Sequence, residues 1–565
     1  MRRGALAAAV IAALALALQA GPSVAQPRLG TVVRLPFPSY DGTLTPYTFE
    51  LGYPLVTLVY DTLFWRGADG LPRAWLARSL QRSNGGRRLT ITLRKGVRWQ
   101  DGQPLTAEDV AFTFQFVATH FHPRFTPELA DVQRVRATGP LTVTVDLRHV
   151  SLGFEDLPLS DLPILPKHLW QRLLPGQLAP PGLPVGSGPY RLVSESPSTG
   201  YVFDANDAYF LGTPRVPQIR VPIIDQEQRA YNALLQGRVD MLPFSLPDAA
   251  TQSLSGVSGI ALRTGSLYSG TSLLLNLRRA PFNSPAARRA VASALDLLQI
   301  ASHAGPASAA QQGLIDPLSP WASGTSLQRF DPSSARATVP RLGLATIHVL
   351  AANNDPVRLD AGKQVVLALR RAGARATLTA VAGAALAQAL GENGSAPRFE
   401  AAVDTTSALP SYDPDFLAAL FGSGPLSAPL NIAGYRSHVF DALAQQVASA
   451  PDPQARRAAT GAELRLLAHD LPVVPLFFSQ GTFAYRPAVY SGWVFVKGTG
   501  ILDKRSFLPG QTPASARSNG GDAAPAGSGS GSGLGFVDIA SLVVVAIVLI
   551  LAAMALLARR SAARR

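Results

Sequence analysis

Cysteine is absent from the 565 residues of this chain, and lysine is scarce, because only five of the 51 basic residues are lysines. Without cysteine the chain cannot form a disulfide framework, a thiolate metal site, a cysteine nucleophile or a lipidated N-terminal cysteine. The hydrophobic content of 47% at this length, by contrast, allows large cores and several domains. A disordered or fibrous protein is therefore excluded.

Charged residues are also few, at 16% of the chain, and the net charge of +14 is not concentrated in a basic cluster with interleaved aromatic residues. Nucleic-acid-binding proteins use such clusters to neutralise phosphates and to stack on bases. We therefore expect no nucleic acid partner.

The N-terminus has the three parts of a secretory signal peptide: a basic start, an apolar run over residues 5–18, and small residues at Ser23 and Ala25. The pattern predicts a signal peptide at residues 1–25 with cleavage after Ala25. An uncleaved N-terminal anchor is the alternative, although the apolar run is shorter than the ~20 residues that a membrane span requires.

The C-terminal region predicts a membrane anchor on a tether. Residues 539–558 are uninterruptedly apolar or small, and the basic tail at 559–565 favours a cytoplasmic C-terminus. A buried core helix is the alternative. Residues 511–535 are rich in Gly, Ser and Ala, which predicts a flexible linker. The body between the two ends is therefore expected outside the cytoplasm, anchored in the cytoplasmic membrane by its own C-terminal helix.

The body alternates strand and helix patterns, which predicts a mixed α/β class. Apolar residues alternate with period two at residues 31–35, 89–94 and 141–147, as in half-buried strands. Thr106 precedes an apolar run and can cap a helix, with Glu108 and Asp109 at the positive end of its dipole. Further helices are expected at 286–300, 361–372, 438–448 and 453–468, and a strand is expected between them at 347–351.

One long segment, RKGVRWQDGQPLTAEDV at residues 94–110, resembles the signature of the family 5 extracytoplasmic solute-binding proteins, the peptide/nickel-type components of ABC importers. It reads as a turn at Asp101-Gly102 that leads into the capped helix. The resemblance covers residues 29–497, and further matches follow in the order of the family at 54–80, 164–169, 185–190, 233–240, 276–282, 413–417 and 469–476.

The resemblance implies a two-lobed α/β periplasmic-binding-protein type II fold with an additional inserted domain, to which the C-terminal transmembrane helix is added. The implied division is lobe I at residues 29–53, 185–271 and 477–510, the inserted domain at 54–184 and lobe II at 272–476. The implied function is capture of a peptide or peptide-like solute by lobe closure and its delivery to ABC permease subunits. Glycines at Gly186 and Gly188 suit a hinge, and an ordinary tight turn is the alternative.

No catalytic or metal constellation emerges from the sequence. His120 and His122 form a close pair without further ligands nearby, Glu108 and Asp109 are explained by capping, and Ser187 lacks the rest of a nucleophile elbow. We therefore expect no enzyme, no metal site and no cofactor. A binding module for sensing or scaffolding and, further behind, a secreted hydrolase are the alternatives.

The expected ligand site departs from peptide-binding relatives. These commonly carry an acid a few residues before their Asp-Pro element to pair with the peptide amine, and here that position is Pro410. An unpaired buried ammonium would be costly, which favours a neutral, blocked or differently anchored ligand, although Asp404 or Asp413 could substitute. The candidate ligand-binding residues are Tyr40, Tyr268, Tyr412 and Asp413, because tyrosine can stack on an apolar group and still form a hydrogen bond.

Overall fold

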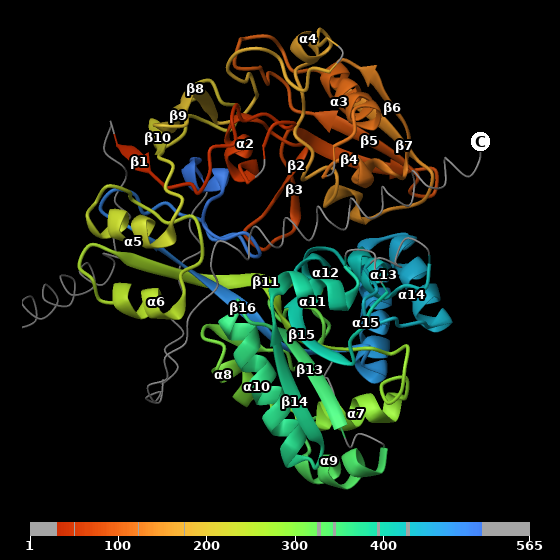
Figure 1. The fold of residues 1–565 in the computed structure, drawn as a ribbon. Coiled ribbons are helices and arrows are strands. Elements are labelled where there is room, and N and C mark those ends of the chain that lie inside the picture. Colours follow the sequence, from red (N-terminus) through yellow and green to blue (C-terminus); the bar gives the residue numbers. More distant parts are fainter. Residues whose placement is uncertain are drawn as a thin grey trace, which may run out of the picture.

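The computed structural model describes residues 31–510, except 50, 123, 175, 325–328, 343–345, 393–395 and 425–429. Two halves lie one above the other in Figure 1 and are joined by two long strands. The upper half comprises the described residues of 31–260 and 486–510, and the lower half those of 276–472.

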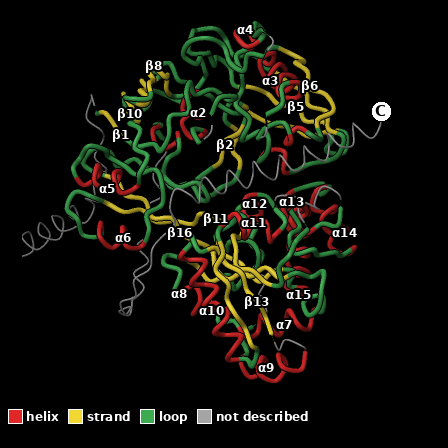
Figure 2. The backbone as a smooth tube through the Cα atoms, viewed as in Figure 1, coloured by secondary structure: helices red, strands yellow, loops and turns green. Residues whose placement is uncertain are grey.

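The upper half contains two four-stranded sheets (Figures 1 and 2). The first has the order β1-β10-β9-β8, and its strands are Val32–Arg34, Gln218–Val221, Gly200–Ala205 and Tyr190–Ser196. The second has the order β4-β5-β7-β6, and its strands are Ala77–Ser83, Arg88–Leu93, Thr142–Leu147 and Val132–Gly139. The short pair β2 (Phe64–Arg66) and β3 (Pro72–Ala74) leads into the second sheet.

Helices of the upper half pack their apolar faces against these sheets. Helix α3 (Ala107–Thr119) begins where the sequence predicts: Thr106 accepts from the N–H of Glu108 at 3.3 Å, and Asp109 accepts from the N–H of Thr106 at 2.8 Å. Its buried face packs on the second sheet in one core. The other helical segments of this half are α2 (Tyr53–Val59), η1 (Pro127–Leu129), η2 (Gly153–Glu155), α4 (Lys167–Trp170), α5 (Glu227–Leu235), α6 (Asp248–Leu254) and η4 (Lys504–Phe507).

The lower half is built on a six-stranded mixed sheet with the order β12-β16-β11-β15-β13-β14. The strands are Ala307–Ala309, Val473–Tyr485, Ala261–Leu275, Ala401–Thr406, Thr346–Ala352 and Arg375–Val381. The surrounding helices are α7 (Pro285–Ala294), α8 (Leu297–Ser302), α9 (Pro332–Thr338), η3 (Val339–Leu342), α10 (Pro356–Arg371), α11 (Gly383–Leu390), α12 (Leu409–Tyr412), α13 (Asp415–Phe421), α14 (His438–Ala448) and α15 (Pro453–Asp470).

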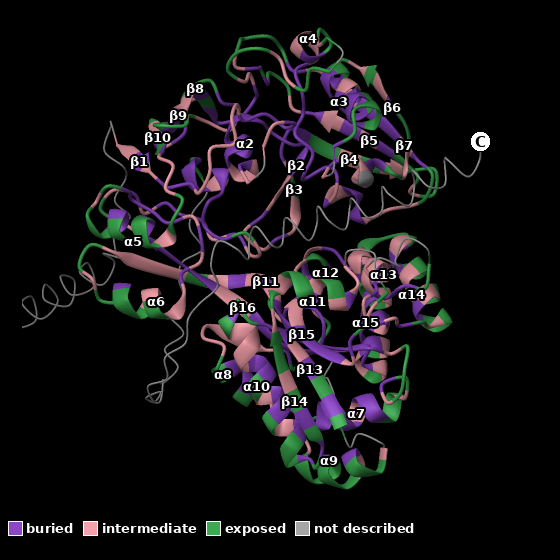
Figure 3. Ribbon diagram, viewed as in Figure 1, coloured by how far each residue is buried: buried purple, intermediate pink, exposed green. Residues whose placement is uncertain are grey.

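Strands β11 and β16 belong to both halves. The first part of β11, residues 261–266, pairs with residues 480–485, and residues 270–274 of its last part pair with residues 473–478. Phe483 of β16 lies in the core of the upper half, whereas Phe477 of the same strand lies in the core of the lower half. Along β11 the residues change from partly exposed to buried (Figure 3). The crossing between the halves is therefore a two-stranded ladder.

Gly186 and Gly188, which the sequence predicts as a hinge, are explained in the structure by a close contact with the backbone of α2. A Cβ on Gly186 would lie 1.9 Å from the carbonyl oxygen of Val59, and the N–H of Gly188 donates to that oxygen at 2.7 Å. Glycine is required because the chain touches the backbone of α2 here. This segment joins the two sheets of the upper half, whereas the ladder of β11 and β16 joins the halves.

The predicted fold class needs one correction. It included a C-terminal transmembrane helix at residues 539–558, but no helix of the described residues is long and apolar enough to cross a membrane. The structure therefore does not support this part of the prediction. Residues 539–558 lie outside the described residues, as do the predicted signal peptide at 1–25, the linker at 511–535 and the tail at 559–565.

Candidate functional site

Tyr268 marks the crossing between the halves. The ladder register shifts between Ser266 and Gly270, so that residues 267–269 bulge out of β11. Tyr268 has a φ of 62° and is fully buried, and its hydroxyl donates to the carbonyl oxygen of Asp69 at 3.3 Å. A tyrosine in the left-handed region is strained, and it persists only where its surroundings hold it. The bulge therefore fixes this side chain between the halves.

Tyr412 meets Tyr268 from the lower half. Their rings pack edge to face with centroids 5.2 Å apart. Arg66 of β2, in the upper half, places its guanidinium carbon 4.4 Å from the centre of the Tyr412 ring. This cation–π contact crosses directly from one half to the other.

Asp413 is the next residue, and it is already paired. It forms an ion pair with Arg456 of α15, and the two side chains are 4% and 3% exposed. Arg456 also lies 2.8 Å from Asp415. Asp413 packs against Gly153 of the upper half, where its carboxylate occupies the space of a Cβ. The candidate amine anchor is therefore a member of a charged cluster rather than a lone carboxylate.

The upper half contributes further charged residues near Tyr412 and Asp413. Arg66 pairs with Asp156 at 2.9 Å, and Arg124 pairs with Asp161 through two bonds of 2.6 and 2.7 Å. The carboxyl group of Glu128 interacts electrostatically with Asp161, Arg124 and Arg66. We call the following residues the interface cluster: Arg66, Arg124, Glu128, Asp156, Asp161, Tyr412, Asp413, Asp415, Arg456 and Glu463.

Several carboxyl groups of the interface cluster have pKa values above the ordinary range of a carboxyl group. Burial raises the pKa of Asp156 well above its usual range, and Asp413 adds to the effect. Burial raises the pKa of Asp415 to about 6 and that of Glu463 to about 8, and in each case a neighbouring aspartate adds to the rise. The cluster therefore favours bound protons or another positive charge.

Tyr40 stands apart from the other three candidates. Its ring stacks on Tyr201 with centroids 5.3 Å apart, beside the first sheet of the upper half. Among the described residues, no contact joins Tyr40 to Tyr268, Tyr412 or Asp413. The structure thus brings three of the four predicted residues together.

Most charged members of the interface cluster were not predicted from the sequence. Arg456, Thr460 and Glu463 follow one another at helical spacing on the buried side of α15, beside Leu464 and Leu467. Polar residues at positions of an otherwise apolar stripe were the available signal. Arg66, Arg124 and Asp156 show no comparable local pattern.

The histidine pair serves packing. The His120 ring stacks on Phe116 with centroids 3.9 Å apart, and the ring of His122 accepts from the N–H of Arg124 at 3.1 Å. Burial lowers the pKa of His122 to about 4. Within the described part of the chain, no three His, Asp or Glu side chains are grouped to hold a metal ion.

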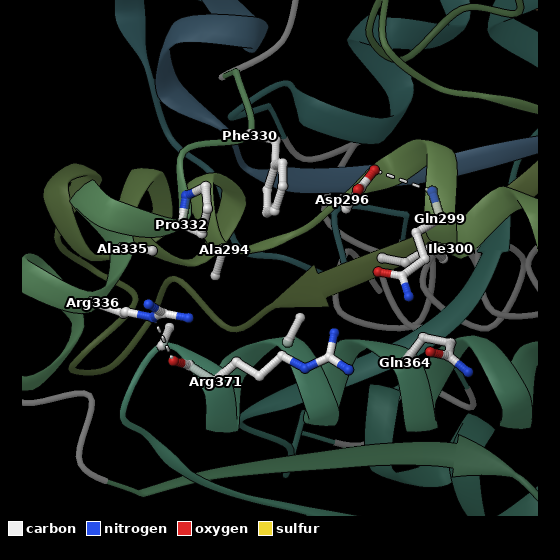
Figure 4. A pocket seen from close by; sticks show the side chains of 12 residues that line it. Ala294, Asp296, Gln299, Ile300, Phe330, Pro332, Ala335, Arg336, Gln364 and Arg371 are labelled. Carbon is white, nitrogen blue, oxygen red and sulfur yellow. Dashed lines mark hydrogen bonds between the residues drawn. The ribbon is translucent and has the colours of Figure 1, made fainter.

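A separate pocket lies wholly within the lower half, between α8, α9 and α10 (Figure 4). Its lining includes Phe330, Arg336 and Arg371, and it contains none of the four predicted ligand residues. Its lining comes from the lower half alone, away from the contacts between the halves, so it is the weaker candidate site.

The architecture is that of two-lobed α/β substrate-binding proteins, as solved structures show. The ABC transporter substrate binding protein CtaP from Listeria monocytogenes superposes with a TM-score of 0.74 at 21% identity, covering 85% of this chain and 99% of that chain. The oligopeptide-binding protein AppA from Bacillus subtilis, in complex with a nonapeptide, superposes with a TM-score of 0.62 at 20% identity, covering 81% of this chain and 95% of that chain.

The chain belongs to the bacterial extracellular solute-binding proteins, family 5, whose model matches residues 72–427. This confirms the family expected from residues 94–110. The probable peptide-binding protein YejA of Agrobacterium fabrum is 26% identical over 305 residues, which are 46% of this chain and 48% of the relative. The chain spans about half the length of the curated relatives it matches.

Proposed function

We propose that this protein captures a peptide or peptide-like solute between its two halves and delivers it to the permease of an ABC importer. The observation that carries the proposal is the set of contacts across the halves: Arg66 on Tyr412, Asp413 against Gly153, and the Lys497 ammonium donating to the carbonyl oxygen of Leu318 at 2.7 Å. These contacts exist only when the halves are together.

A binding protein needs an open state for loading and a closed state for presentation. A solute shifts this equilibrium only by contacts that it makes better in the closed state. Groups that face one another across the ladder of β11 and β16 can make such contacts. Tyr268, Tyr412 and Asp413 are our proposed ligand contacts, and Tyr40 stays a prediction for a more distant contact.

The division of the body belongs to the same proposal. Lobe I would consist of residues 29–53, 185–271 and 477–510, with the inserted domain at 54–184 and lobe II at 272–476. The two four-stranded sheets of the upper half, each with its own core, support a distinction between lobe I and the inserted domain.

Extraction of the purified full-length protein, followed by mass spectrometry, identifies any solute that copurifies. Titration of that solute should raise the melting temperature as its concentration passes the dissociation constant, and the solute should be recovered intact after long incubation. Conversion of the solute, abolished by a single polar substitution at the interface cluster, would contradict a pure binding role.

A further inference from the structure

Negative charge exceeds positive charge in the interface cluster. Three guanidinium groups, those of Arg66, Arg124 and Arg456, face six carboxyl groups. The carboxyl groups are those of Glu128, Asp156, Asp161, Asp413, Asp415 and Glu463. The neighbouring pairs Arg82–Glu155 and Lys497–Asp316 each add one charge of each sign and leave the excess unchanged.

Some of these groups also lack hydrogen-bond partners. Glu463 is fully buried, and neither of its carboxyl oxygens has a partner among the described residues. The hydroxyl of Thr460, one helical turn before it and 2% exposed, is likewise without a partner, as is Oε2 of Glu128. Buried acceptors of this kind are costly unless donors reach them. Nε of Arg456 is in turn a buried donor without an acceptor. Glu463 and Glu128 nevertheless leave three carboxyl oxygens that no donor of the described residues reaches.

The pairing within the cluster indicates the kind of donor. Each guanidinium group already pairs with a carboxylate, so a ligand carboxylate bound there would add a like charge beside an existing carboxylate. A compact metal ion fits poorly, because within the described residues no three acidic or histidine side chains converge on one point. Ammonium and guanidinium groups on a flexible chain carry both the positive charge and several donors.

From this geometry we infer that the ligand held between the halves is cationic, a short peptide with basic side chains. The inference rests on the proposed function and adds the charge of the solute. Asp415 and Glu463 supply the negative charge on the lower side, and Glu128 with Asp161 on the upper side. Arg66, Arg124 and Arg456 neutralise three of the six carboxyl groups, so that up to three ligand cations or bound protons complete the balance.

Binding of a cation should release protons. The groups that face Glu463 are Asp415 and Arg456, and those that face Asp415 are Asp413 and Arg456. A ligand ammonium adds positive charge to this set, lowers the raised pKa values of both carboxyl groups and thus displaces protons near neutral pH. Affinity for a cationic ligand should accordingly fall as the pH falls from about 8 to about 6.

The test compares Lys-Gly-Lys, Gly-Gly-Gly, Glu-Gly-Glu and spermidine by titration calorimetry of the full-length protein at pH 6.5, in buffers of different ionisation enthalpy. We expect Lys-Gly-Lys to bind at least about tenfold more tightly than Glu-Gly-Glu, since like charges placed together are strongly disfavoured. We also expect proton release with Lys-Gly-Lys. Glu463→Gln should reduce that release and the preference for lysine. Glu392→Gln is the matched control, because the pKa of Glu392 is also raised, to about 7, but by burial and Asp404 rather than by the cluster.

Each outcome decides a separate point. Equal binding of the lysine and glutamate peptides, or the same preference in Glu463→Gln as in the wild type, would overturn the cationic ligand while leaving the proposed function intact. Binding of spermidine without any peptide would support the cationic ligand and overturn the peptide part of the proposed function. Absence of binding in all four titrations would overturn the cationic ligand, whereas the proposed function is decided by the solute recovered by mass spectrometry.

Discussion

Replacement of Lys504 by methionine tests how η4 (Lys504–Phe507) is held to the rest of the upper half. The Lys504 ammonium lies 2.7 Å from Oδ1 of Asp61, and both side chains are fully buried. The same carboxylate accepts from the Trp75 indole at 2.9 Å and from the Tyr209 hydroxyl at 3.1 Å. Loss of the ammonium leaves a buried carboxylate whose charge is no longer compensated.

Removing one partner of a buried ion pair typically costs about 3–5 kcal/mol. For a unit of 150–250 residues this corresponds to a fall in melting temperature of roughly 6–20 °C. Urea unfolding followed by tryptophan fluorescence is a suitable assay, because Trp65 and Trp75 flank the Lys504 ammonium.

The double variant Asp61→Asn, Lys504→Met is the control, because it removes both charges. We expect it to recover most of the lost stability, since apolar or neutral replacements of a buried pair are often tolerated. A single variant within about 1 kcal/mol of the wild type, or a double variant as unstable as the single one, would show that the Lys504–Asp61 pair does not hold this region.

Three further predictions concern the crossing, a helix cap and a buried acid. Tyr268→Phe removes the hydrogen bond to the carbonyl oxygen of Asp69 across the halves, which is worth about 0.5–1.5 kcal/mol. The affinity for the solute, measured by calorimetry, should therefore fall about 2- to 10-fold. Unchanged affinity would contradict a role of Tyr268 in closure. Thr106→Ala removes the cap of α3 and should cost about 1 kcal/mol of unfolding free energy, whereas Thr119→Ala at the other end of that helix should stay within about 0.5 kcal/mol of the wild type. Because burial raises the pKa of Glu463 from 4.5 to about 8, the folded state retains a proton that the unfolded state releases, so ligand-free stability should fall as the pH rises from about 5 to about 8. Glu463→Gln should flatten this decline in pH-dependent denaturation, and an equal slope in both proteins would contradict the assignment.

Local sequence signals predicted the elements whose ends are set by nearby residues. Helices α3 and α14 begin at the predicted positions because Thr106 and Ser437 cap them. The helix predicted at 286–300 is instead two helices, α7 and α8. Leu295 is extended, and Asp296 accepts from the N–H groups of Leu298 and Gln299 to start the second helix. An aspartate inside a helical pattern was the overlooked signal.

The candidate site depended on pairings distant in sequence, which local patterns do not reveal. The crossing arises because residues 261–266 and 270–274 pair with residues 473–485, more than 190 positions away. Arg66 and Tyr412 meet only through this topology. Tyr268, Tyr412 and Asp413 could be proposed from the family resemblance, but their charged surroundings required the three-dimensional arrangement.

Closure of the two halves on the solute can be followed by a distance measurement between them. Because the chain has no cysteine, Thr138→Cys in β6 and Thr379→Cys in β14 place a pair of spin labels uniquely, at exposed positions of the upper and lower halves. Pulsed electron paramagnetic resonance then gives the distance distribution with and without the solute identified by mass spectrometry. We expect a longer, broader distance distribution without solute and a shorter, narrower one at saturation. An unchanged distribution, at a solute concentration where calorimetry shows full binding, would contradict closure of the halves.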